Sequence, residues 1–345
     1  MILSWQKFLA QHSAVIAEGV AQHFGDSTAE LLATASRNVL CDLHQFGTLR
    51  VAGEEAQSFL QNLLSNDIRE VNSTRAQLSS LNSAKGRMLA SFLIWRDGED
   101  YLLQLPHSLV EMMRKKLGMY VLRAKVKVTD ESDECIALGI AGSNAEEILQ
   151  KAFNDLPLET FACLRTAQGC VIKLSDTRFQ VISKQDQAEV LWDTLSFYAT
   201  PVGSASWDWL NIRSGTPIIL PQTQEQFVAQ MVNFDLIGGI NFKKGCYPGQ
   251  EIVARTHYLG KLKRRMYLAH IDTTDVPQAG DELFSADMGG QAGGMIVNAA
   301  PAPSGGFDTL AVVQMSSQET QTIHWKSLRG EALKFLPLPY DLPSI

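Results

Sequence analysis

The order of apolar and polar residues in the first third of the chain predicts a helix followed by a β-hairpin. In GEEAQSFLQNLLSND, residues 53–67, apolar side chains recur at the i, i+3, i+4, i+7 spacing of an amphipathic helix. The next segment, LNSAKGRMLASFLIWRDGEDYLLQL, has an apolar run on each side of an Asp-Gly turn at 97–98, which is typical of a hairpin. We expect a further helix over 107–118 and a half-buried strand over 124–130.

The middle of the chain mixes strands and helices. CIALGIAG predicts a strand, SNAEEILQKAF a helix capped by Ser143, CVIKL and FQVIS a strand pair, and DQAEVLWDTLSFYA a helix. These elements lack the regular βαβ spacing of a doubly wound sheet, so the pattern favours an α+β fold over an α/β fold. After Lys261 the chain changes to short apolar runs separated by Gly, Pro and Asp, which predicts a small terminal β-barrel.

Composition places the chain among globular proteins. Of its 345 residues, 45% are hydrophobic and 19% are charged. Polar residues interrupt the N-terminal MILSWQKFLAQHSAVIAEGV, and no stretch approaches about 18 consecutive apolar residues, so we expect a cytoplasmic protein without a membrane contact. The length predicts two or three structural units.

The five cysteines, at 41, 135, 163, 170 and 246, form no CxxC pair. This spacing argues against a disulfide framework and against a sequence-local zinc or iron–sulfur site, so we expect no resident metal. Cys135 and Cys170 lie beside strand-like runs and are interpreted as small core residues.

The net charge of −7 disfavours a protein that coats nucleic acid, but the charge is unevenly distributed. Residues 243–265 contain seven basic residues and one acidic residue, and residues 111–127 contain six and one. Each run is either a solvated face or an anion-binding surface, and the sequence leaves both interpretations open.

Residues 238–255, GGINFKKGCYPGQEIVAR, place Cys246 in an unusual setting. Pro248 suits the first turn of a helix, so the cysteine is expected just ahead of a positive helix end. Gly245 and Gly249 can take positive φ angles, and a loop built in this way would hold the sulfur exposed.

Two effects on the Cys246 thiol oppose each other. Lys243, Lys244 and a helix end would lower its pKa, whereas desolvation by Phe242 and Tyr247 would raise it. The sequence alone does not decide between them.

The run KGCYPGQE resembles the signature KGCYxGQE of the YgfZ family of folate-binding proteins. The resemblance extends to the VAGEEAQSFLQNLLSND, NSAKGRM, WLNIRSGTP and FLPLPY segments, and so to most of the chain. It implies two interleaved ferredoxin-like α+β units of the kind found in the glycine cleavage T-protein, an aminomethyltransferase, with a C-terminal β-barrel. We assign residues 1–130 with an N-terminal helix to the first unit, 131–262 with the KGCYPGQE loop to the second, and 263–345 to the barrel.

The same resemblance implies a function and a set of site residues. Members of the family bind tetrahydrofolate or a derivative and support iron–sulfur proteins or their assembly factors, and through them the methylthio modification of tRNA. Cys246 is then the functional thiol. The positions implied for cofactor binding are Phe46, Trp207, Lys244, Tyr247, Gln250 and Arg255. Aromatic faces at Phe46 and Trp207 would stack on a pterin or aminobenzoyl ring.

One position departs from the family pattern. Arg213 in IRSG stands where the family has the carboxylate of IEAG. A guanidinium has only donors, so it cannot accept hydrogen bonds from the amino and ring N–H groups of a pterin.

Three other functions remain as alternatives. A folate-dependent aminomethyltransferase is disfavoured because residues 85–91 contain no carboxylate. A Cys246 nucleophile with His257 as its base lacks a recognisable acidic partner. An RNA-binding module would use the two basic runs, but the chain carries no recognised RNA-binding motif.

Overall fold

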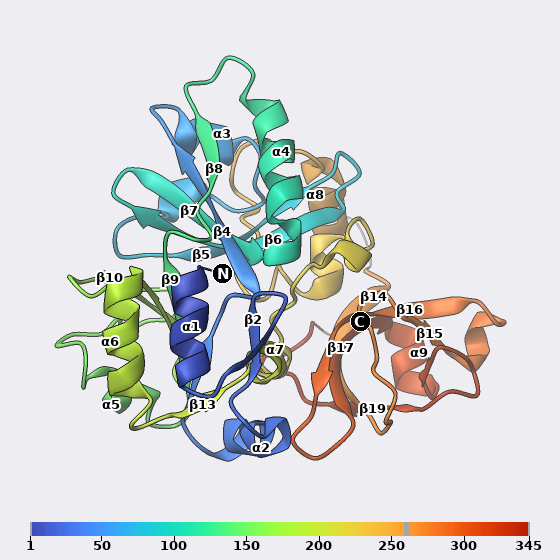
Figure 1. Ribbon diagram of the computed structural model, residues 1–345. Helices are drawn as coiled ribbons and strands as arrows, with labels where there is room; N and C mark the ends of the chain where they lie inside the picture. The colour runs from blue at the N-terminus through green and yellow to red at the C-terminus, as the bar shows by residue number, and fades with distance from the viewer. Residues whose placement is uncertain (1, 259–261, 344–345) are drawn as a thin grey trace. The chain divides into compact units, whose positions relative to one another are not determined.

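Two compact units make up the protein in a computed structural model that describes residues 2–258 and 262–343 (Figure 1). Unit 1 consists of Met1–Phe59, Arg69–Gln77 and Leu93–Trp207, and unit 2 consists of Leu60–Ile68, Leu78–Phe92 and Asp208–Ile345. Helices and strands alternate irregularly, which confirms a mixed α+β fold. The assignment of domains to 1–130, 131–262 and 263–345 stays a prediction.

Unit 1 contains a six-stranded sheet. Its order is β10-β11-β12-β9-β3-β13, and all neighbours are antiparallel except β13 and β3. The strands are Cys163–Arg165 (β10), Cys170–Ser175 (β11), Arg178–Ser183 (β12), Ile136–Ala141 (β9), Val39–Asp42 (β3) and Thr200–Val202 (β13). The strands predicted from CIALGIAG, CVIKL and FQVIS are therefore confirmed.

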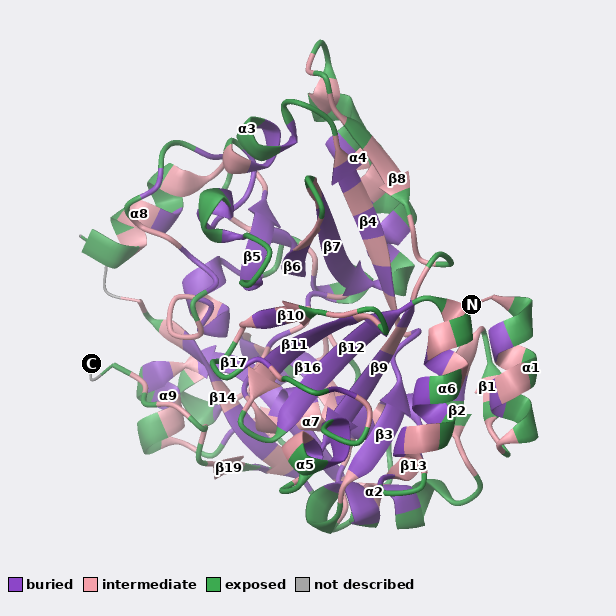
Figure 2. Ribbon diagram, turned by 90° about the vertical axis from the view of Figure 1, so that its left-hand side faces the viewer, coloured by how far each residue is buried: buried purple, intermediate pink, exposed green. Residues whose placement is uncertain are grey.

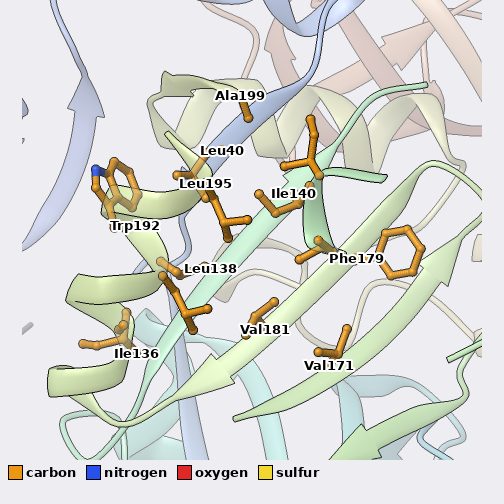
Figure 3. Packing of buried hydrophobic residues seen from close by; sticks show 14 of the residues in the cluster. Leu40, Ile136, Leu138, Ile140, Val171, Phe179, Val181, Trp192, Leu195 and Ala199 are labelled. Atoms are coloured by element: carbon orange, nitrogen blue, oxygen red, sulfur yellow. The ribbon is translucent and has the colours of Figure 1, made fainter. Parts of the chain in front are cut away.

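Residues on one face of this sheet pack with helices into a hydrophobic core. Leu138, Phe179 and Val181 belong to one cluster with Trp192 and Leu195 of α6 (Gln185–Leu195), and Figure 3 shows Leu138 near the helix and the Phe179 ring farther along the sheet. The residues of these strands are mostly buried, whereas α6 alternates between buried and exposed positions (Figure 2). The helix predicted from DQAEVLWDTLSFYA is thus confirmed, and it ends at Leu195.

Two short helices also belong to unit 1 near this core. Helix α1 (Leu3–Gln11) buries Trp5, whose Nε1 donates a hydrogen bond of 2.9 Å to Asp42. Helix α5 (Ala145–Leu149) has Asn144 at its N-cap position without a side-chain cap bond. The predicted Ser143 cap is wrong, because the Ser143 hydroxyl donates to the Asn144 side chain at 2.7 Å.

A second sheet has five strands in the order β5-β6-β7-β4-β8. The strands are Gln77–Asn82 (β5), Met88–Asp97 (β6), Asp100–Pro106 (β7), Phe46–Ala52 (β4) and Lys127–Asp130 (β8). Strands β6 and β7 meet at the Asp97–Asp100 pair, which confirms the hairpin at 97–98. Helix α4 (Val110–Val121) follows the short 3₁₀ helix His107–Leu109 and confirms the helix expected near 107–118.

The helix predicted over 53–67 is shorter in the structure. Helix α3 spans Ala56–Gln61, and a 3₁₀ helix follows at Ile68–Glu70. The intervening backbone turns because the carbonyl groups of Gln61, Leu64 and Asn66 accept hydrogen bonds from Lys244. A distant side chain therefore overrides the local apolar periodicity.

The C-terminal part of unit 2 is an antiparallel sheet that curls into a half-barrel. Its order is β18-β15-β16-β17-β14-β19. The strands are His324–Trp325 (β18), Glu282–Phe284 (β15), Ala292–Pro301 (β16), Phe307–Gln314 (β17), Arg264–Ile271 (β14) and Leu333–Leu336 (β19). Its core contains Ala269, Leu283, Ile296, Val313 and Trp325. Each apolar run after Lys261 thus supplies a strand as predicted.

The remaining elements precede these strands or lie between them along the chain. They are β1 (Val15–Ala17), β2 (Val20–His23), α2 (Ser27–Ser36), α7 (Ser204–Arg213), α8 (Gln250–Tyr258), α9 (Met315–Thr320) and 3₁₀ helices at Pro221–Thr223, Ala229–Val232 and Ala286–Met288. Strands β1 and β2 pair with each other. None of the helices in the described residues is long and apolar enough to cross a membrane.

Candidate functional site

The KGCYPGQE loop of unit 2 leads into α8 and exposes Cys246. The thiol makes no hydrogen bond or ion pair with any residue that the structure describes. This exposure confirms the prediction that the loop presents the sulfur to solvent. A thiol of this kind is free to act as a nucleophile or as a metal ligand for another molecule.

Helix α8 begins two residues later than Pro248 predicts. Gly249 has φ +77°, a left-handed conformation that cannot belong to the helix interior, and the first helical residue is Gln250. The Val253 N–H donates to the Gly249 carbonyl at 3.3 Å, so Gly249 stands at the entrance to the helix. Cys246 lies four residues before the helix.

Lys244 turns inward and anchors the start of the loop. Its side chain is buried, and its Nζ donates to the carbonyl oxygens of Gln61 at 2.7 Å, Leu64 at 2.5 Å and Asn66 at 3.0 Å. The ammonium also lies 5.1 Å from the centroid of the Tyr247 ring. The Lys244 ammonium thus holds residues 61–66 against the loop, whereas the side chain of its neighbour Lys243 is exposed.

Tyr247 and Gln250 form the inner side of the loop. Tyr247 is buried, and this burial raises the pKa of its phenol to about 12, so the phenol is neutral at physiological pH. The Gln250 side chain donates to the Lys244 carbonyl at 3.4 Å. Arg255, on α8, is exposed and makes no ion pair with a residue in the described part of the chain.

The loop docks directly on the segment that contains NSAKGRM. A Cβ atom on Gly249 would come within 2.5 Å of Gly86 Cα and of the Ser83 carbonyl oxygen. A Cβ atom on Gly86, where φ is +70°, would lie 2.8 Å from Ile252 Cβ. Two glycines that are 163 residues apart in sequence therefore meet backbone to backbone, and glycine is required at both contact points.

A pair of glycine substitutions tests this contact. Gly249→Ala should lower the free energy of unfolding by about 2–3 kcal/mol, because alanine adds a clash to an unfavourable positive φ. Gly245→Ala should change it by less than about 0.5 kcal/mol, because no atom lies within 4 Å of the added Cβ. Urea unfolding of both variants measures the difference, and equal effects would argue against a docked loop.

The basic run 243–265 is only partly a surface feature. Arg265 is buried and forms a bidentate pair with Asp235 at 2.7 and 2.9 Å, and Lys244 is buried as described. His257, the candidate base, stacks on Phe242 with ring centroids 3.8 Å apart. Lys261 lies outside the described residues.

Trp207, in unit 1, is packed inside the protein. Its side chain is buried, and a Cβ on Gly139 would lie 2.5 Å from the ring. The Arg178 guanidinium lies 4.6 Å from the ring centroid, and burial lowers the pKa of Arg178 to about 10, so the group is still charged at neutral pH. Glycine, tryptophan and arginine thus form one packed cluster.

Phe46 is the more accessible of the two candidate aromatic residues. It is half-buried at the start of β4, opposite Pro106 of β7. Alternation along the paired strands places Phe46 on the same face as Thr48 and Gln104. The rings of Phe46 and Trp207 do not contact each other in the described structure.

Three polar residues just before Phe46 were missed by the sequence analysis. Asp42 Oδ1 accepts from His44 Nδ1 at 2.7 Å, while Asp42 Oδ2, His44 Nε2 and the Gln45 amide are buried without a hydrogen-bond partner in the described residues. Buried polar atoms without protein partners are uncommon. The signal available in the sequence was the polar DLHQ interruption after an apolar run.

Arg213, the residue that departs from the family pattern, is directed to a carboxylate. Its Nη1 lies 3.7 Å from Asp308 Oδ2 on β17, which also accepts from Trp209 Nε1 at 2.8 Å. His270 Nδ1 lies 2.9 Å from Asp308 Oδ1. Within the described residues, no group of three or more His, Cys, Asp or Glu side chains is arranged to hold a metal ion.

Comparisons with known proteins show what the chain is similar to. Residues 6–196 match the family described as the GCVT N-terminal domain. The proteins named "tRNA-modifying protein YgfZ" from Escherichia coli O7:K1 and Escherichia fergusonii are 28% and 29% identical to the chain over 306 residues, which is 88% of this chain and 93% of each relative.

A solved structure shows the fold independently. The glycine cleavage system aminomethyltransferase T from Bartonella henselae superimposes with a TM-score of 0.76 over 98% of this chain and 97% of that chain, at 18% identity. The chain therefore has the T-protein fold, is similar to the YgfZ proteins, and belongs to the GCVT N-terminal domain family.

Proposed function

We propose that this protein binds tetrahydrofolate or a derivative and acts in the cytoplasm as an accessory factor for the assembly or repair of iron–sulfur proteins. Through those proteins it would support the methylthio modification of tRNA, in keeping with the name of its relatives. The observation that carries the proposal is the exposed Cys246 thiol on a loop fixed by Lys244 and Gly249.

The thiol is suited to act on a partner rather than alone. A fixed loop lowers the entropy lost when the sulfur attacks or ligates a group on another molecule. One cysteine supplies too few ligands for a whole cluster, so the remaining ligands must come from an iron–sulfur protein or an assembly factor. This requirement favours an accessory role over a self-contained enzyme.

Folate binding is supported by the family and by the aromatic and polar residues around Phe46. Phe46 offers an aromatic face for a pterin or aminobenzoyl ring, and the polar atoms of Asp42, His44 and Gln45 lie directly before it in the chain. Trp207 stays a candidate for a less accessible ring contact. We also propose that Tyr247, Gln250 and Arg255 contact the cofactor, and that the T-protein fold here comprises two ferredoxin-like units with a terminal barrel.

Aminomethyl transfer fits the structure less well. The segment that docks on the KGCYPGQE loop, residues 83–91, has no carboxylate to assist proton transfer, a contribution of about 10²–10⁴-fold in rate. Direct contact with tRNA ranks second among the alternatives. Its supporting observation is that Lys116, Arg123 and Lys127 of the basic run 111–127 form no ion pair in the described part of the structure.

Ligand titration tests the proposal. Tetrahydrofolate at about 100 times its Kd should stabilise the protein by about 2.7 kcal/mol, which corresponds to a rise in Tm of about 5 °C, and it should change tryptophan fluorescence. Phe46→Leu should weaken this response about tenfold in apparent Kd, because leucine offers no ring face. Phe24→Leu is the matched control, since Phe24 is a half-buried aromatic residue packed on Trp192. An unchanged Tm and fluorescence at millimolar tetrahydrofolate would refute folate binding.

A further inference from the structure

Two of the five cysteines lie side by side at the edge of the six-stranded sheet of unit 1. In the antiparallel register of β10 and β11, Cys163 faces Ile172 and Cys170 faces Arg165. The two cysteines are thus on one face of the sheet and are diagonal neighbours. The hairpin that joins them closes with a hydrogen bond of 2.8 Å from Thr166 N–H to the Gly169 carbonyl.

The two side chains interact with each other. This interaction lowers the pKa of Cys170 and raises the pKa of Cys163. The positive charge of Arg165, opposite Cys170 in the register, also lowers the pKa of Cys170. Both side chains are buried, so a reagent reaches them only when the edge of the sheet opens.

The other cysteines are in different settings. Cys41 donates to the carbonyl oxygens of Asp42 and Gly203, burial raises the pKa of Cys135, and Cys246 is exposed on its loop. Cys163 and Cys170, in contrast, interact with each other through their side chains.

We propose that Cys163 and Cys170 are a redox pair that forms a reversible disulfide in response to a hydroperoxide. The Cys170 thiolate attacks an oxygen of hydrogen peroxide, which breaks the O–O bond, oxidises the sulfur to a sulfenic acid and releases the other oxygen as water after protonation. The Cys163 sulfur then attacks the sulfenic sulfur, the S–O bond breaks, and a second water leaves. In total, two thiols and one peroxide give one disulfide and two waters.

Strand geometry makes this disulfide easy to reduce. Diagonal residues on antiparallel strands have Cα atoms about 7–8 Å apart, whereas disulfides prefer about 4.4–6.8 Å, so closure must draw the strands together. Strand β10 can yield because it is three residues long and lies at the sheet edge. A bond that holds strain is readily reversed by cellular thiols, which suits a switch better than a permanent staple.

Movement of β10 would reach the segment 69–77. The Cys163 N–H donates to the Thr74 carbonyl at 2.8 Å, and the Ala76 N–H donates to the Phe161 carbonyl at 2.8 Å. Both ends of this segment continue into chain segments of unit 2. Oxidation should therefore change the protection of amides at 74–76 as well as the state of the thiols.

Thiol counting and mass spectrometry test the proposal on the full-length Cys246→Ser protein, which retains four cysteines and cannot couple through the exposed thiol. Hydrogen peroxide should remove two thiols, lower the mass by about 2 Da and yield a peptide cross-linked between Cys163 and Cys170, and dithiothreitol should restore all four. Hydrogen exchange of the Ala76 amide should become at least twofold faster on oxidation, because movement of β10 loosens the bond from this amide to the Phe161 carbonyl.

Matched variants identify the pair. Cys163→Ser and Cys170→Ser should each abolish the cross-link and the change in exchange, while Cys135→Ser should keep both. Peptide mapping of the Cys246→Ser protein itself decides the matter if either serine variant fails to fold. Four thiols remaining after millimolar peroxide, or a cross-link that involves Cys41 or Cys135, would overturn the proposal.

Discussion

Cys246→Ala should abolish the support that the protein gives to iron–sulfur enzymes while leaving its Tm within about 1 °C of the wild type. The side chain is exposed and makes no hydrogen bond with a described residue, so its removal costs almost no folding free energy. The chemistry depends entirely on the sulfur, because alanine can be neither a nucleophile nor a metal ligand. The activity of an iron–sulfur enzyme in cells that lack the native protein measures the effect.

Two further variants make that result specific. Cys135→Ala should retain full activity, since Cys135 is a half-buried thiol outside the KGCYPGQE loop. Cys246→Ser should be as inactive as the alanine variant, because a hydroxyl keeps the size but not the thiolate chemistry. Full rescue by Cys246→Ala would exclude the thiol from the function and leave the loop with a binding role.

Lys244→Met should lower the free energy of unfolding by about 3–5 kcal/mol, and the Tm by about 10 °C. Methionine keeps much of the aliphatic volume but leaves the carbonyl groups of Gln61, Leu64 and Asn66 without their ammonium donor in a buried site. The contact between the Lys244 ammonium and the Tyr247 ring is lost as well. Urea and thermal unfolding measure the change.

Lys243, the neighbour of Lys244, provides the control. Lys243→Met should change stability by less than about 0.5 kcal/mol because that side chain is exposed. The comparison also separates two roles for Lys244. A stable Lys244→Met protein that fails to bind tetrahydrofolate would support direct cofactor contact, whereas a destabilised one would show that Lys244 anchors the loop.

Local patterns predicted the elements whose causes are local. The Asp-Gly turn at 97–98 and the apolar stripe of α6 each depend on neighbouring residues, and both are present. The helix expected over 53–67 ends at Gln61 because Lys244, nearly two hundred residues later, takes its carbonyl groups. The apolar periodicity of a short segment contains no information about a partner as distant in sequence as Lys244.

The candidate site likewise has features that depend on adjacent residues, which the sequence predicted, and features that depend on distant residues, which it did not. The glycines and proline around Cys246 predicted an exposed sulfur, because loop chemistry is written in adjacent residues. The direction in which a side chain points cannot be predicted from adjacent residues. Lys243 and Lys244 are identical in type, yet one is exposed and one is buried on three carbonyls. The pairing of Arg213 with Asp308 likewise joins residues that only the fold brings together.

The discontinuity of unit 2 has a consequence for synthesis. Its residues 60–68 and 78–92 leave the ribosome more than a hundred residues before Asp208, where the rest of the unit begins. These early segments contain buried residues such as Leu60, Leu81 and Met88, and unit 2 is complete only after the residues from Asp208 onward have been translated. A gene cut at any single point between residues 93 and 207 therefore yields two fragments, neither of which contains the whole of unit 2.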